Sequence, residues 1–176
     1  MSNSSILEMD YITYSNSTTK DTLDKINKGA YNVRIVDINI EDAVATAALD
    51  KGIEGFIVSD YSSNLDSAAL DSLNLIGSRL KSIDIKLPAE FDLSSEPEEF
   101  NAVKKITISA NSFINRQSVL NKISHGYTAS LTGATVKEAI SLSSNIHVAD
   151  FDISDSVQNI SSNWDNLLTI KNKLDE

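Results

Sequence analysis

Residues 56–85, FIVSDYSSNLDSAALDSLNLIGSRLKSIDI, contain a strand, a helix and a second strand. The stretch opens on bulky apolar residues, breaks at Ser59 and Asp60, and then carries apolar residues at helical spacing from Leu65 to Leu80. It closes on alternating apolar and polar residues, which are typical of a strand with one buried face. Because strand and helix alternate, the stretch predicts parallel strands joined by a helical crossover.

The same pattern returns near the C-terminus, in residues 151–174, FDISDSVQNISSNWDNLLTIKNKL. Asp155 matches Asp60, and Asn159 matches Asn64, at a constant offset of 155 − 60 = 95 residues. This agreement predicts two internal repeat copies.

The helices of the two copies align after one deletion, which places Trp164 opposite Leu70 and Leu167 opposite Leu73. These positions lie on the apolar stripe of each helix. We therefore expect Leu73 and Trp164 to be core residues of equivalent repeats. The alternative for Trp164, the only tryptophan, is an anchor for a binding partner.

Strand-like segments recur along the chain with most steps near 22 residues, as from Asn32 to Glu54 (54 − 32 = 22). We predict a single α/β repeat domain over residues 1–176. The first copy covers about 10–87, a connecting loop and helix cover 88–104, and the second copy covers about 105–176.

Capping residues set the expected helix boundaries. Asn39 predicts the start of a helix over 40–51, and Thr135 with Glu138 predicts a capping box at the corresponding position of the second copy. Asp60 or Asn64 is expected to cap the helix of the opening stretch. Residues 11–15 are predicted as a strand, 18–28 as a helix, and 157–174 as one last helix.

One face of the predicted sheet is polar, because Ile83 and Ile85 alternate with Ser82 and Asp84, and later strands follow the same rule. The fold class is therefore an α/β solenoid with a parallel sheet and helices mainly on one face. The outward positions are expected to line one continuous binding surface. They are Arg34, Asp84, Lys86, Thr107, Ser130, Thr132, Asp150 and Asp152.

The composition narrows the function classes. Acidic residues outnumber Lys and Arg by 25 to 15, and the net charge of −10 disfavours binding to nucleic acid or to anionic lipid. The chain has no cysteine and only two histidines, His125 and His147, neither with a neighbour at metal-binding spacing. No apolar run reaches the ~18 residues of a membrane span, and the first residues lack a signal-peptide pattern.

The acidic motifs have two interpretations each. Ser59–Asp60 and Ser154–Asp155 are typical of helix caps, with ligand carboxylates as the alternative. Asp150, Asp152 and Asp155 form a weak calcium candidate, weighed against a solvated acidic strand face. No catalytic or phosphate-binding motif occurs, so we expect no enzyme activity, no catalytic residue, no cofactor other than this calcium, and no other metal site.

The pattern Val58-Ser59-Asp60, Asn64-Leu65 and Leu70-Asp71, repeated as Ile153-Ser154-Asp155, Asn159-Ile160 and Trp164-Asp165, resembles the short α/β repeat modules of large secreted bacterial surface and RTX-type proteins. The resemblance implies a secreted or cell-surface structural or adhesive module. It transfers no enzymatic residue, and the calcium-binding nonapeptides of RTX proteins are missing.

Two functions follow as hypotheses. The first is a non-enzymatic structural or interaction module of a bacterial extracellular layer, fibre or adhesin, which binds protein partners or self-associates through its repeat ends or its sheet face. The alternative is an acidic soluble binding protein, of inhibitor or immunity type, that uses the exposed sheet face. A cytoplasmic location is left open.

Overall fold

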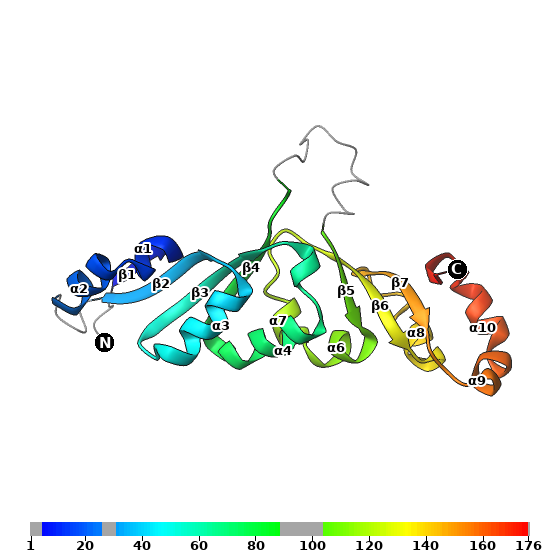
Figure 1. Ribbon diagram of the computed structural model, residues 1–176. Helices are drawn as coiled ribbons and strands as arrows, with labels where there is room; N and C mark the ends of the chain where they lie inside the picture. Colours follow the sequence, from blue (N-terminus) through cyan, green and yellow to red (C-terminus); the bar gives the residue numbers. More distant parts are fainter. Residues whose placement is uncertain (1–4, 26–30, 89–103, 176) are drawn as a thin grey trace.

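The computed structural model describes residues 5–25, 31–88 and 104–175, and its strands form two all-parallel sheets (Figure 1). The first sheet contains β1 (Ser5–Asp10), β2 (Tyr31–Ile38), β3 (Ile53–Asp60) and β4 (Leu80–Ile85), paired in chain order. The second contains β5 (Lys105–Ser109), β6 (Thr128–Ala134) and β7 (Val148–Ile153), also in chain order.

Helices alternate with the strands, as predicted. They are α1 (Tyr11–Ser15), α2 (Ser17–Lys25), α3 (Ile40–Leu49), α4 (Ser67–Ile76), α6 (Ala110–Asn115), α7 (Gln117–Leu120), α8 (Val136–Leu142), α9 (Val157–Ser162) and α10 (Trp164–Thr169). Figure 1 shows α3, α4, α6, α7 and α8 on the same side of the strands, with α7 beside α4. The helix α1 is bonded to α3 and to the residue that follows it, since the hydroxyl of Tyr11 donates to Asp42 at 3.3 Å and that of Tyr14 donates to Asp50 at 2.7 Å.

The prediction of one sheet is wrong, because β4 and β5 do not pair. The outer edge of β4 is bonded instead to the segment that precedes β6. The amide of Ile83 donates to the carbonyl of Lys122 at 2.8 Å, and the amide of Ser124 donates to the carbonyl of Ile83 at 2.7 Å. This segment takes the position that β5 would need, so the ladder breaks into two sheets at a single bridge between Ile83 and Ile123.

The inward residues of both sheets and the facing residues of the helices form the core. Phe56, Leu73 and Ile83 in the first copy are fully buried, as are Ile106 and Phe151 in the second. One hydrophobic cluster includes residues from both sheets. Each such side chain contributes about 1.5–3 kcal/mol by leaving water, so this cluster is the main stabilising feature of the fold.

Three predicted elements need correction. Residues 11–15 form the helix α1, because Asp10 caps it by accepting from the Thr13 amide at 2.7 Å. The helix α4 is capped by Asp66, which accepts from the Ala69 amide at 2.8 Å, and neither Asp60 nor Asn64 has this role. The last helix is divided into α9 and α10 at Asn163.

Other boundaries agree with the sequence. Asn39 caps α3, and Thr135 with Glu138 forms the complete capping box of α8. The predicted helix 18–28 is present as α2, and its last residues lie outside the described residues. The predicted connection 88–104 also falls mostly outside them.

Candidate functional site

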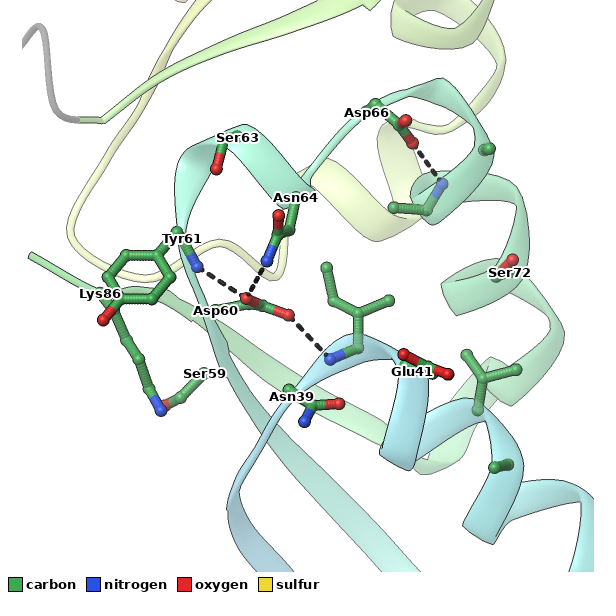
Figure 2. Close-up of a pocket in the computed structure, with 15 residues that line it drawn as sticks. Asn39, Glu41, Ser59, Asp60, Tyr61, Ser63, Asn64, Asp66, Ser72 and Lys86 are labelled. Atoms are coloured by element: carbon green, nitrogen blue, oxygen red, sulfur yellow. Dashed lines mark hydrogen bonds between the residues drawn. The ribbon is translucent and has the colours of Figure 1, made fainter. Parts of the chain in front are cut away.

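A groove with a volume of about 940 Å³ lies where β3 ends and α3 begins (Figure 2). Side chains from the first turns of α3 and α4 line it together with the residues that follow β3. The carboxyl ends of parallel strands are the usual place for ligands in open α/β sheets. The polar side chains of this groove are therefore candidates for a binding or catalytic role.

Asp60 lies at the base of the groove, is 7% exposed, and has both carboxylate oxygens occupied. Its Oδ2 accepts from the amide of Ile40, the first residue of α3, at 3.0 Å. Its Oδ1 accepts from the Tyr61 amide at 2.9 Å and from the Asn64 side-chain amide at 2.7 Å, as Figure 2 shows. The negative charge thus sits at the N-terminus of α3, where the helix dipole favours it.

Asp155 makes the same three hydrogen bonds in the second copy. Its Oδ2 accepts from the amide of Val136, the first residue of α8, at 3.0 Å. Its Oδ1 accepts from the Ser156 amide and from the Asn159 side chain, each at 2.7 Å. These bonds, first that of the Asn159 side chain and then those of the Val136 and Ser156 amides, lower the pKa of Asp155 below its ordinary value.

The groove above Asp155 also repeats, with a volume of about 620 Å³. Glu41 in the first groove corresponds to Lys137 in the second, so the two grooves do not share their charged lining. What they share is the aspartate and the asparagine at the base. The aspartate of the repeated Ser–Asp motif therefore binds the N-terminus of the helix before its strand, α3 or α8. The prediction that it caps the helix after its strand is wrong, because Asp66 caps α4 and Ser156 caps α9.

A second contact that repeats in both copies was missed by the sequence analysis. The guanidinium of Arg79 donates to the carbonyls of Ala47 and Asp50, at 2.7 and 2.9 Å, where α3 ends. The ammonium of Lys173 donates to the carbonyls of Val148 and Asn145, at 2.7 and 3.3 Å, after α8 ends.

Lys122 makes a third contact of this kind, on the carbonyls of Gly77 and Leu80 after α4. The sequence did not predict these contacts, because most Lys and Arg residues lie on the surface and their type alone does not reveal which carbonyls they bind. The three cations bind carbonyls at or shortly after the ends of α3, α4 and α8, whereas the two aspartates bind the first amides of α3 and α8.

The polar face of the first sheet carries a row of four charges that alternate in sign from strand to strand. Arg34 pairs with Glu8 at 2.9 Å and with Glu54 at 3.0 Å, and Lys81 pairs with Glu54 at 2.7 Å. Hydrogen bonds from Lys81 and, to a smaller extent, from Arg34 lower the pKa of Glu54. The hydrogen bond with Glu54 in turn raises the pKa of Arg34. A Cβ on Gly55 would overlap the aliphatic part of the Lys81 side chain, so glycine at this position allows Lys81 to cross β3.

The predicted sheet-face residues are divided between the two sheets. Arg34, Asp84 and Lys86 belong to the first sheet or follow it, and Thr107, Ser130, Thr132, Asp150 and Asp152 belong to the second. Their expected single row is therefore corrected to two groups. Thr107, Ser130 and Asp150 do stand side by side on three strands, although Ser130 is only 9% exposed.

Three of these charges are paired. Arg34 lies in the row just described, Lys86 pairs with Asp37 at 2.9 Å, and Asp150 pairs with Lys105 at 2.7 Å. Thr107, Thr132 and Asp152 are exposed. The exposed part of the predicted surface thus lies on the second sheet.

The calcium candidate is not assembled. Asp155 faces the first turn of α8, Asp150 faces Lys105, and Asp152 is exposed to solvent. Within residues 5–25, 31–88 and 104–175, no group of three or more His, Cys, Asp or Glu side chains is arranged to hold a metal ion.

The histidines and the tryptophan lie apart from both grooves. The His147 ring stacks on Tyr127 with 4.5 Å between centroids, and burial raises the pKa of Tyr127 to about 12. His125 is exposed in a turn with a φ of 62°. Leu73 is fully buried, as predicted, but Trp164 is 56% exposed, so its predicted place in the core is wrong.

Among the helices that the structure describes, none is long and apolar enough to cross a membrane. No family model, no curated protein and no solved structure matches the chain. The resemblance to bacterial surface repeat modules therefore stays a prediction.

Proposed function

We propose that this chain is a non-enzymatic structural and interaction module, an α/β solenoid segment of a bacterial extracellular layer, fibre or adhesin. The observation that carries the proposal is the equal use of Asp60 and Asp155. In both copies of the most conspicuous polar motif, the aspartate accepts three hydrogen bonds, one of which comes from the first amide of a helix. A motif used twice in this way serves to build repeats.

The contacts between neighbouring units support an extensible stack. Arg79 reaches back to carbonyls at the end of α3, and Lys173 reaches back to carbonyls of the segment that follows α8. Contacts of this kind need only the nearest neighbour, which is the property that allows repeat proteins to grow by addition of units. Among the described residues, β1 pairs only with β2, and the outer edge of β7 is bridged only at Phe151, by Leu174, so further units would add at these two ends.

The mass of the protein as a function of concentration tests the proposal. Size-exclusion chromatography with multi-angle light scattering is expected to give an average mass that rises with concentration above the 19.2 kDa of one chain. A mass of one chain at every concentration would contradict self-assembly and favour the acidic binding protein. In that case the exposed residues of the second sheet, Thr107, Thr132 and Asp152, would be the first surface to test.

A further inference from the structure

The two repeat copies provide an internal comparison for the groove between the first turns of α3 and α4. In each copy an aspartate and an asparagine at the base of the groove bind one another and the local backbone. The remaining lining of the first groove is not shared with the second, so it is not required to build a repeat. Its charged and aromatic members are Glu41, Tyr61, Asp66 and Lys86.

The first groove carries an excess of negative charge. Its charged lining comprises three carboxylates, those of Glu41, Asp60 and Asp66, and one ammonium, that of Lys86. The Lys86 ammonium is paired with Asp37 at 2.9 Å, so it does little to offset the carboxylates.

The second groove lacks this excess. Its charged lining is one carboxylate, Asp155, and one ammonium, Lys137. Ser156 follows Asp155 where Tyr61 follows Asp60, so the aromatic ring is missing as well. The second groove is therefore a control for ligand binding within the same molecule.

Helix N-termini ordinarily favour an anion, and two of them border the first groove. In both, however, an amide of the first turn already has a carboxylate acceptor. Asp60 accepts from the Ile40 amide of α3 at 3.0 Å, and Asp66 accepts from the Ala69 amide of α4 at 2.8 Å. These carboxylates offset the positive ends of the two helices, so the groove favours a cation.

Glu41 and Asp66 are the carboxylates that such a cation would meet. Glu41 lies in the first turn of α3, and Asp66 directly precedes α4, so the two line the groove from different helices. Both residues are exposed, and within residues 5–25, 31–88 and 104–175 neither takes part in an ion pair.

The rest of the lining suits a side chain with an aliphatic stem. The ring of Tyr61 is 46% exposed, and Figure 2 shows it on the other side of Asp60 from Glu41. Small apolar residues complete the groove, namely Val44, Ala45, Ala68 and Ala69. Arginine combines an apolar stem with a planar cation that pairs with carboxylates and stacks on aromatic rings. The volume of about 940 Å³ is in the range of sites that hold more than a single ion.

We propose that this groove binds an extended segment of a partner protein through an arginine side chain, whose guanidinium pairs with Glu41 and Asp66. The site uses neither end of the stack. It therefore goes beyond self-assembly, and its test and the test of self-assembly have separate outcomes.

Saturation-transfer difference NMR tests the site with a blocked tripeptide of alanine, arginine and alanine as the probe. The matched probe carries citrulline, which has the shape of arginine without its charge. The signals come from the peptide in excess, so assembly of the protein does not hide them. The wild type is expected to saturate the arginine methylenes several-fold more than those of citrulline.

Variants of the carboxylates locate the binding. Glu41→Gln is expected to weaken binding of the arginine probe about two- to fivefold, as for an exposed ion pair. Glu41→Gln combined with Asp66→Asn, which keeps a residue that can cap α4, is expected to weaken it further. Asp152→Asn removes one exposed carboxylate outside the groove and is expected to bind like the wild type.

Circular dichroism establishes that each variant is folded. Three results would overturn the site: no saturation of the arginine probe by the wild type, equal saturation of the arginine and citrulline probes, or wild-type binding by the double variant. A loss of binding in Asp152→Asn as large as that in Glu41→Gln would also overturn it, because it would show an effect of net charge alone.

Discussion

At the scale of single residues, Asp60 and Asp155 explain why the repeat motif recurs. Each carboxylate joins the end of a strand to the start of a helix that lies about twenty positions earlier in the chain, with bonds to Ile40 and Val136 respectively. The nearby asparagine, Asn64 or Asn159, orients the carboxylate. The carboxylates of Asp60 and Asp155, at the base of the two grooves, therefore bind backbone amides of their own chain.

Asp60→Asn is expected to destabilise the fold. Asparagine keeps the size of the side chain, but it places an amide N–H₂ among three donors, so at least one buried donor loses its acceptor at a cost of about 1–3 kcal/mol. Urea denaturation measures the free energy of unfolding. Asp152→Asn changes an exposed carboxylate and is the matched control, with an expected shift within about 0.5 kcal/mol. Equal stability of the two variants would refute the structural role.

At the scale of elements, the sequence predicted most strands and helices because apolar periodicity and capping residues are local signals. The strand Tyr31–Ile38 and the capping box at Thr135 follow directly from such signals. The cap of α4 was missed because Asp60, Asn64 and Asp66 are all good capping residues within one short segment. Only the tertiary bond from Asp60 to α3 decides among them.

The polar face of the first sheet depends on pairing across four strands, and this pairing predicts a pH effect. The pKa of Glu54 is lowered by Lys81 and Arg34, so folded Glu54 stays ionised at pH values where the unfolded chain is protonated. The stabilisation is complete above the unfolded pKa and is lost as the pH falls through the folded pKa.

Glu54→Gln is therefore expected to be less stable than the wild type at neutral pH, and the difference is expected to shrink on acidification. Urea midpoints between pH 7 and about pH 3 measure this difference for both proteins. The exposed Asp152→Asn variant serves again as the control. A difference that is independent of pH would show that the charge of Glu54 has no part in stability.

At the scale of the whole molecule, the sequence predicted the alternating α/β architecture but missed the break between the sheets and the exposure of Trp164. Both errors have one cause. Local periodicity does not reveal which unit packs beside which, so the insertion of the segment around Ile123 beside β4 left no signal. Trp164 has the same helical spacing as its equivalent, Leu70, which is buried where α6 and α7 pack against α4. Among the described residues no such helices pack against α10, so Trp164 is exposed.

Electron microscopy of the concentrated wild-type protein tests the central claim, that the repeats form an interaction module that extends end to end. Growth by addition of units at the two ends of the stack predicts unbranched linear assemblies that lengthen with concentration. Wild-type particles of one-chain size at all concentrations, or closed pairs that never lengthen, would contradict the account.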